Sequence, residues 1–139
     1  MINLPFELIP LARWKVYRAL LPKGSAIEHR IIIMSNVDDL EFFYVTRSIE
    51  KAKVRMKKDK AALVELSPED WPECLTDRCC IQCGLFGLES IKKEEIKELY
   101  EKGKFSLIGD VPDNIKTKII AAVCASVSFS PAEKKFYTL

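Results

Sequence analysis

Four polar side chains stand at the ends of two neighbouring runs of β-branched and aromatic residues. They are His29, Arg30, Thr46 and Ser48. An arginine guanidinium offers parallel N–H donors to a phosphate, a histidine exchanges a proton near neutral pH, and hydroxyl groups donate hydrogen bonds. Together these residue types suit the binding of an anionic group and proton transfer beside it, although their pattern leaves the substrate open.

The two runs predict adjacent antiparallel strands over residues 30–35 and 41–48. β-branched and aromatic residues favour strands, and the intervening Asn36-Val37-Asp38-Asp39 is typical of a turn. Binding and catalytic residues are common where the chain leaves a rigid element. We therefore expect the four polar side chains near the ends of this strand pair.

A strongly basic run follows these strands. Between residues 51 and 60, six basic residues face the single acid Asp59, whereas the whole chain has a net charge of +2. The six are Lys51, Lys53, Arg55, Lys57, Lys58 and Lys60. Such side chains bind nucleic-acid phosphates without regard to base sequence. A solvated loop or hairpin has the same composition, so the RNA-binding interpretation depends on the position of the run directly after residues 46–48.

The five cysteines raise the question of a metal site. They are Cys74, Cys79, Cys80, Cys83 and Cys124. Cys80 and Cys83 have the spacing of a zinc-binding pair, but a second pair is missing. We expect reduced thiols that pack as small apolar side chains, and neither a metal nor a cofactor. The glycines form no dinucleotide-binding or Walker-type motif.

Length and composition favour one domain over residues 1–139. The chain is 48% hydrophobic and contains no run of about 20 apolar residues that would span a membrane. Its first residues lack the basic region of a secretory signal, so we expect a cytoplasmic protein without membrane contact. Apolar residues at three- and four-residue intervals predict a helix over residues 6–21, bent at Pro10, within an N-terminal extension over 1–23.

The remaining predicted elements alternate strands with helices. Strands are expected at 61–66, 78–83 and 104–109, with a short closing strand at 127–129. Helices are expected at 91–102, between Ser90 as N-cap and Gly103, and at 112–125. Short links between consecutive strands favour antiparallel pairing. The predicted class is α+β, with a small, strongly curved sheet or a partly open Src-homology-3-like barrel; an open sheet is the alternative.

Three short segments resemble the PemK/MazF-type toxin ribonucleases. Residues 24–35 are similar to the first strand of that family, where an arginine, here Arg30, follows a variable loop. Residues 45–48 are similar to a strand whose end carries a Thr-Ser pair, and residues 75–82 resemble the segment that enters the next strand. The resemblance extends over residues 24–129. Two departures are Ile31, where the family has proline, and Arg47, which separates Thr46 from Ser48.

The resemblance implies a toxin-like endoribonuclease, or an inactive relative, that acts on single-stranded RNA without a metal. It also implies a homodimer and an antitoxin protein as partner. Cleavage by a neighbouring 2′-hydroxyl needs a base, an acid and cationic groups for the phosphorane. Arg30 suits the cationic role, His29 and Asp77 are candidates for proton transfer, and the hydroxyls of Thr46 and Ser48 for phosphate binding.

The competing interpretation is a non-catalytic protein-interaction domain on the same curved sheet. In that case the N-terminal segment or the basic run would bind a protein partner. The two interpretations differ in one geometric requirement. A catalytic site needs Arg30 and at least one of His29, Asp77, Thr46 or Ser48 to converge on a common point.

Overall fold

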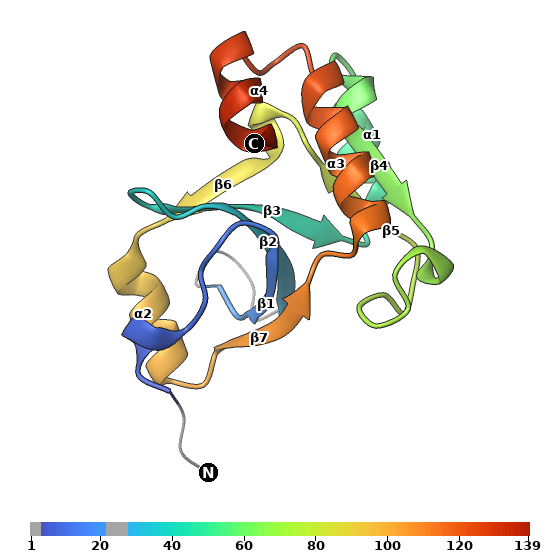
Figure 1. The fold of residues 1–139 in the computed structure, drawn as a ribbon. Helices are drawn as coiled ribbons and strands as arrows, with labels where there is room; N and C mark the ends of the chain where they lie inside the picture. The colour runs from blue at the N-terminus through green and yellow to red at the C-terminus, as the bar shows by residue number, and fades with distance from the viewer. Residues whose placement is uncertain (1–3, 22–27) are drawn as a thin grey trace.

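The structure is a computed structural model that describes residues 4–21 and 28–139. Its strands form one antiparallel sheet with helices around it, which confirms an α+β class (Figure 1). The strands are β1 (Lys15–Ala19), β2 (His29–Ser35), β3 (Leu40–Thr46), β4 (Leu63–Leu66), β5 (Cys79–Gln82), β6 (Leu88–Ile91) and β7 (Phe105–Asp110). The helices are α1 (Ile49–Arg55), α2 (Lys93–Glu101), α3 (Asp113–Ala125) and α4 (Pro131–Thr138), and the 3-10 turns are Phe6–Leu8, Lys60–Ala62, Pro68–Asp70 and Leu85–Gly87.

The strand order places β2 and β3 in the middle of the sheet. The hydrogen-bonded path runs β4-β5-β3-β2-β1-β7, and β6 also pairs with β3. The two partners divide β3 between them, because β6 pairs with residues 40–43 and β5 with residues 45 and 46. In the described part of the chain, β4 and β7 end the path without pairing with each other, so the sheet is not closed.

Strand β2 is apolar from Ile31 to Met34 because both faces of the sheet are covered there. Successive side chains of a strand point to opposite faces. Ile32 and Met34 belong to one buried cluster, and Ile31 and Ile33 belong to another on the other face. Each of these four side chains is fully buried. Burial of one such side chain contributes about 1.5–3 kcal/mol, so β2 anchors both cores.

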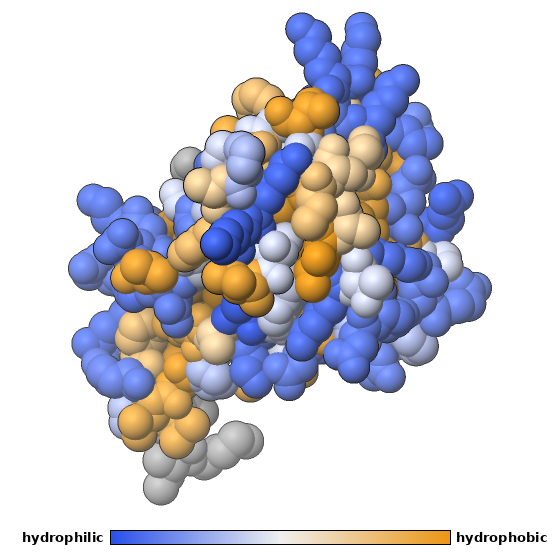
Figure 2. All heavy atoms as spheres, turned by 45° about the horizontal axis from the view of Figure 1, so that its top comes forward, coloured by the Kyte–Doolittle hydropathy of each residue, from blue (hydrophilic) through white to orange (hydrophobic). Residues whose placement is uncertain are grey.

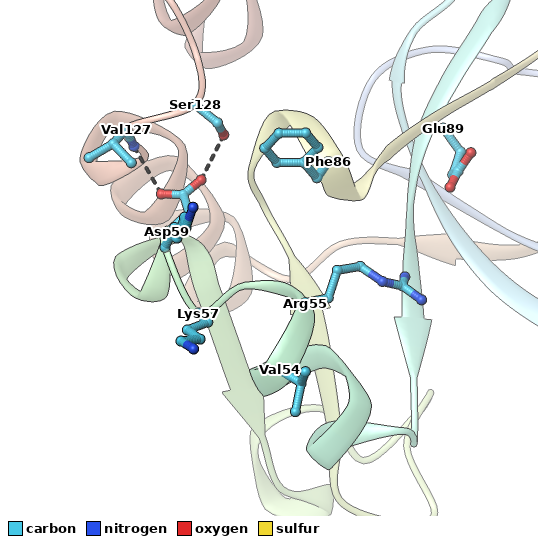
Figure 3. Close-up of a pocket in the computed structure, with 9 residues that line it drawn as sticks. Val54, Arg55, Lys57, Asp59, Phe86, Glu89, Val127 and Ser128 are labelled. Carbon is cyan, nitrogen blue, oxygen red and sulfur yellow. Dashed lines mark hydrogen bonds between the residues drawn. The ribbon is translucent and has the colours of Figure 1, made fainter.

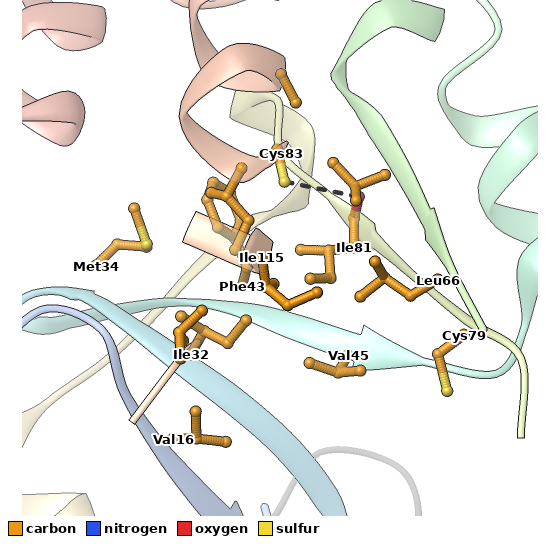
Figure 4. Close-up of a cluster of buried hydrophobic side chains, with 14 of the residues drawn as sticks. Val16, Ile32, Met34, Phe43, Val45, Leu66, Cys79, Ile81, Cys83 and Ile115 are labelled. Atoms are coloured by element: carbon orange, nitrogen blue, oxygen red, sulfur yellow. Dashed lines mark hydrogen bonds between the residues drawn. The ribbon is translucent and has the colours of Figure 1, made fainter. Parts of the chain in front are cut away.

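Helices α2 and α3 belong to different cores. Ile115 and Ile119 of α3 join the cluster that contains Ile32 (Figure 4). Ile96 and Leu99 of α2 join the cluster that contains Ile31. The sheet thus separates two apolar layers, with α2 in one and α3, together with Tyr137 of α4, in the other.

The predicted strands over 30–35 and 41–48 are confirmed as β2 and β3. They pair antiparallel, with Arg30 opposite Val45 and Ile32 opposite Phe43. The strands expected at 61–66, 78–83 and 104–109 are confirmed as β4, β5 and β7, and the helix at 112–125 as α3.

The predicted N-terminal helix over residues 6–21 is wrong, and the expected extension over 1–23 is not helical in its described part; residues 1–3 and 22–23 lie outside the described residues. Only Phe6–Leu8 form a 3-10 turn, and β1 lies between β2 and β7 inside the sheet. The apolar residues whose spacing predicted one helix lie in and around two different elements, the 3-10 turn and β1. Val16 and Tyr17, adjacent in sequence, enter opposite cores as residues of a strand do. Trp14 before them has a φ of +75°, which no continuous right-handed helix allows.

Two boundaries in the second half of the chain also differ from expectation. Ser90 is not the N-cap of a helix, because β6 extends through it and pairs Ser90 with Glu41. Helix α2 therefore begins at Lys93, with Lys92 in the N-cap position. The glycine expected after this helix is confirmed, since Gly103 has a φ of +73° that favours glycine.

Residues 127–129 do not form the expected closing strand, and a third helix of the C-terminal half, α4, follows them. A capping box starts this helix. The Ser130 hydroxyl accepts from the Glu133 N–H at 3.2 Å, and the Glu133 carboxylate accepts from the Ser130 N–H at 2.9 Å. The sequence Ser-Pro-x-Glu carried that signal, with proline at the first helical position.

The basic run begins in a helix instead of a loop or hairpin. Helix α1 contains Lys51, Lys53 and Arg55, and it contacts β4 and β5. Its anchors are Ala52 and Met56, which are each 1% exposed. Residues i and i+4 share a helix face, so Ala52 and Met56, the residue directly after α1, are buried on the same side of the helix.

Candidate functional site

All five candidate catalytic residues expected from the sequence line one pocket of about 290 Å³. They are His29, Arg30, Thr46, Ser48 and Asp77. The other residues around the pocket are Glu28, Val45, Arg47, Thr76 and Cys79. Three segments that are far apart in the sequence therefore meet at the point where β2 begins and β3 ends.

The strand registers explain this convergence. Antiparallel pairing puts the first residues of β2 beside the last residues of β3, with Arg30 opposite Val45. The next pair of strands puts Thr46 opposite Cys80 at the start of β5. The segment that enters β5 must therefore arrive beside Thr46, and this segment contains Asp77.

An ion pair joins two sides of the pocket. The Arg47 guanidinium donates a hydrogen bond of 3.2 Å from Nη1 to Asp77 Oδ2. Both side chains are exposed, so the pair contributes little to stability. The ion pair instead affects the positions of the two side chains. It keeps the Arg47 guanidinium at the pocket that Arg30 also lines, and it engages the Asp77 carboxylate in a hydrogen bond.

Arg47 was not among the predicted site residues. Strand alternation would turn it away from Thr46 and Ser48, but β3 ends at Thr46. Directly after the strand, the Ser48 N–H donates to Thr46 Oγ1 at 3.2 Å. This turn ends the alternation, so Thr46, Arg47 and Ser48 all line the pocket. The helix that begins at Ile49 was not predicted from the sequence. Its start would have indicated that strand alternation does not continue through Arg47 and Ser48.

His29 is placed to accept a proton. It is half-buried at the start of β2, where its ring lies 5.0 Å from the Tyr44 ring, centroid to centroid. Burial lowers the pKa of His29 below the ordinary histidine value, because it disfavours the charged imidazolium. At neutral pH the imidazole is therefore uncharged and one ring nitrogen is available as a base.

Arg30 provides an uncompensated positive charge in the pocket. Of the two acids that line it, Glu28 pairs with Arg18 at 2.6 Å and Asp77 pairs with Arg47. None of the described residues forms an ion pair with Arg30. An anion that enters the pocket is thus the natural partner of its guanidinium.

The cysteines near Arg30 are not activated thiols. Burial raises the pKa of Cys74 to about 11, and the positive charge of Arg30 only partly offsets this effect. Burial likewise raises the pKa of Cys79, which lines the pocket. A thiol nucleophile must ionise, so these two cysteines are structural side chains at neutral pH.

The cysteine cluster does not form a metal centre in the described residues. Cys74, Cys79, Cys80 and Cys83 are buried free thiols, and Cys124 is exposed. Over residues 4–21 and 28–139, no group of three or more His, Cys, Asp or Glu side chains is arranged to hold a metal ion. Within the same residues, no helix has the length and apolar character to cross a membrane.

The basic run lies beside the pocket and does not line it. Lys53 pairs with Glu50 at 3.7 Å and with Glu65 at 3.8 Å, so part of its charge is compensated. Lys51 and Lys60 form no ion pair with the described residues. Arg55, Lys57 and Lys58 line a second, larger groove at the other end of α1.

Comparison with known proteins adds no relative to this description. No protein-family model matches the chain, and no curated protein matches it. The residues and geometry of the pocket are therefore the basis on which a function can be proposed.

Proposed function

We propose that this protein is an endoribonuclease that cleaves single-stranded RNA through attack of a ribose 2′-hydroxyl on the adjacent phosphate. One observation carries the proposal: His29, Arg30, Thr46, Ser48 and Asp77 meet around one pocket. These residues bring together a proton acceptor, cations and hydroxyl donors. A protein-interaction domain has no need for that combination at a single point.

In the proposed reaction, a bond forms between O2′ and phosphorus while the bond between phosphorus and O5′ breaks. The products are a 2′,3′-cyclic phosphate and a 5′-hydroxyl end. Neutral His29 accepts the proton of the attacking 2′-hydroxyl. Asp77 is less suited to this step, because its carboxylate is paired with Arg47. Water in the open pocket gives the proton that the leaving O5′ requires.

The charge that develops on the phosphorane is stabilised by the two arginines. Arg30 presents a guanidinium without an acidic partner in the described residues, and Asp77 holds Arg47 at the pocket. Thr46 Oγ1 already accepts a hydrogen bond from Ser48 N–H, so its own O–H remains free to donate to a phosphate oxygen. Donors that are fixed before reaction lower the barrier without reorganisation.

The strand of RNA would leave the pocket along α1. Lys51 follows Ser48 closely, and Lys51 and Arg55 lie one helical turn apart on the same side of α1. In this proposal Lys51, Lys53, Arg55, Lys57, Lys58 and Lys60 bind phosphates without regard to base sequence.

We further infer three properties from the resemblance to PemK/MazF-type toxins. They are a barrel-like curvature of the open sheet, an antitoxin partner and a homodimer. Action in the cytoplasm stays a prediction from the sequence. The alternative function, protein binding without catalysis, gains its support from a groove of about 770 Å³ at the C-terminal end of α1.

The test is cleavage of end-labelled single-stranded RNA of mixed sequence by purified protein, with a chelator present. We expect 2′,3′-cyclic phosphate ends from wild type and cleavage slowed about 100-fold or more by Arg30→Ala. Arg78→Ala is the matched control, since Arg78 is an exposed arginine that pairs with Glu65 outside the pocket. Equal cleavage by both variants, or none by wild type, would reject the proposal.

A further inference from the structure

A groove of about 770 Å³ lies at the C-terminal end of α1, separate from the pocket (Figure 3). We call it the α1 groove. Its residues come from α1 and the turn after it, from the β5–β6 connection and the start of β6, and from the segment between α3 and α4. They are Val54, Arg55, Lys57, Lys58, Asp59, Phe86, Glu89, Val127 and Ser128.

Large apolar side chains are exposed around the α1 groove. Val54 is 75% exposed, Phe86 71% and Val127 78%. Figure 2 shows the molecule with the top of Figure 1 turned toward the viewer. On this face, apolar surface (orange) lies between hydrophilic side chains (blue). Single exposed apolar residues are common, but three that line one concave surface indicate a place where another molecule is bound.

The charge at the α1 groove is positive. Arg55, Lys57 and Lys58 form no ion pair with any described residue. The acids of the groove are Asp59 and Glu89. Asp59 is buried and already accepts hydrogen bonds from two serine hydroxyls, so it offers nothing to a ligand. Three cations therefore stand against two acids, and of these acids only Glu89 is free to contact a ligand, so the groove keeps an excess of positive charge.

The floor of the α1 groove is held in place before any ligand arrives. Asp59 accepts from Ser128 Oγ at 2.7 Å and from the Val127 N–H at 2.9 Å. The Leu85 N–H donates to Ser128 Oγ at 2.9 Å, which fixes the turn that carries Phe86. These bonds tie all three sides together, so little ordering cost remains for binding.

We propose that the α1 groove docks an acidic segment of a partner protein that carries large apolar side chains between its carboxylates. The apolar side chains would cover Val54, Phe86 and Val127, and the carboxylates would pair with the cations of the groove. This inference does not depend on the proposed cleavage reaction.

Arg55, Lys57 and Lys58 also belong to the proposed RNA path, so a docked peptide and RNA would compete for these three cations. Two observations favour an acidic peptide over RNA on the apolar part of the groove. Only Phe86 offers an aromatic face on which a base can stack, whereas Val54 and Val127 offer aliphatic surface. Glu89 would repel a continuous phosphate backbone, whereas the few carboxylates of a peptide can lie away from Glu89. The combination of aliphatic surface and a cationic rim matches an amphipathic acidic segment.

The experiment is a selection of displayed random short peptides on the full-length protein. We expect enriched peptides to be acidic and to contain at least two large apolar residues. Their Kd should rise about tenfold or more for Phe86→Ala and for Arg55→Glu. The matched controls are Leu107→Ser and Lys104→Glu, which change an exposed apolar residue and an exposed lysine outside the groove and should leave the Kd unchanged.

The proposal fails if no peptide is enriched, if enriched peptides are not acidic, or if they bind Phe86→Ala as well as wild type. It also fails if Phe86→Ala weakens single-stranded RNA binding as strongly as peptide binding, since RNA would then occupy the groove. Sedimentation tests a second copy of the chain as occupant. Self-association that Phe86→Ala abolishes would replace the peptide proposal with a homodimer.

Discussion

The carboxylate of Asp59 accepts a hydrogen bond of 2.6 Å from the hydroxyl of Ser126, which lies 67 residues further along the chain. Both residues are buried. Burial alone would raise the pKa of Asp59, but hydrogen bonds from Ser126, Ser128 and the Val127 N–H outweigh it and lower the pKa overall. The turn after α1 and the segment after α3 are thus joined through an ionised carboxylate.

Replacement of Asp59 by alanine is expected to destabilise the protein by about 2–3 kcal/mol, because it leaves buried hydroxyl and N–H donors without an acceptor. Since the pKa of Asp59 is lowered in the folded state, its contribution is present above the ordinary aspartate pKa. It is lost as the pH falls from about 4 through the folded value. Urea unfolding across this pH range measures the free energy of unfolding of wild type and variant. The control is Asp38→Ala, which changes an exposed aspartate and should alter the free energy of unfolding little across the range.

Gly84 is required because the Asp59 carboxylate approaches its backbone closely. A Cβ atom at this position would lie 2.5 Å from Asp59 Oδ2 and 3.0 Å from Ser128 Oγ. The carboxylate cannot move aside without loss of its hydrogen bonds, so Gly84→Ala should cost about 1–3 kcal/mol. A double-mutant cycle with Asp59→Ala in urea provides the check. The two losses should not add, and strict additivity would mean that the clash is relieved elsewhere.

The central strand β2 was predictable from sequence because four consecutive residues, Ile31 to Met34, are apolar. They are buried on both faces of the sheet, and a short apolar run of this kind is typical of a strand with both faces covered. The segment around Val16 failed for the opposite reason. Its apolar spacing was shared between a 3-10 turn and a strand, and only the pairing of β1 with β2 and β7 reveals the strand.

The candidate site was predictable where it depends on one hairpin. The β2–β3 register brings His29 and Arg30 to Thr46, and a local turn fixes that register. Arg47 was missed because the turn at Ser48 interrupts strand alternation. The α1 groove could not be predicted, since Phe86 and Val127 reach α1 only through the long-range bonds to Asp59 and Ser128.

Arg30 should affect cleavage far more than binding. Its guanidinium is needed mainly when charge develops on the phosphorane, so Arg30→Ala should lower the cleavage rate about 100- to 1000-fold. Arg30→Lys keeps the charge without the two-pronged donor and should recover only part of the rate. Single-turnover kinetics with a separate RNA-binding measurement distinguishes the two effects. Equal losses in binding and rate would assign Arg30 to binding alone.

The pH dependence of cleavage should report His29. A base must be unprotonated, and burial lowers the pKa of His29 below the ordinary value. The rate should therefore rise with pH through that lowered pKa and be level at neutral pH. His29→Ala should remove this acidic limb as well as most of the rate. If the limb persists in the variant, another group is the base, and Asp77→Asn would be the next variant to measure.

The last prediction concerns the basic run as an RNA-binding surface. Replacement of Lys57, Lys58 and Lys60 by glutamine should weaken binding to all single-stranded RNA sequences alike and flatten its salt dependence, because fewer counterions are released. Stability should change little, since exposed lysines contribute little to folding. A salt titration of binding gives the slope for wild type and variant.

The matched control for this titration is a triple glutamine variant at Lys92, Lys104 and Lys135. Lys92 directly precedes α2, Lys104 directly precedes β7 and Lys135 lies in α4. All three are exposed and form no ion pair with the described residues. Both variants lose the same net charge, so a flatter slope in the first alone locates the RNA path along α1. Identical slopes in both would leave long-range charge as the explanation. A slope equal to wild type would make the run a solvated surface and favour protein binding at the α1 groove as the main function.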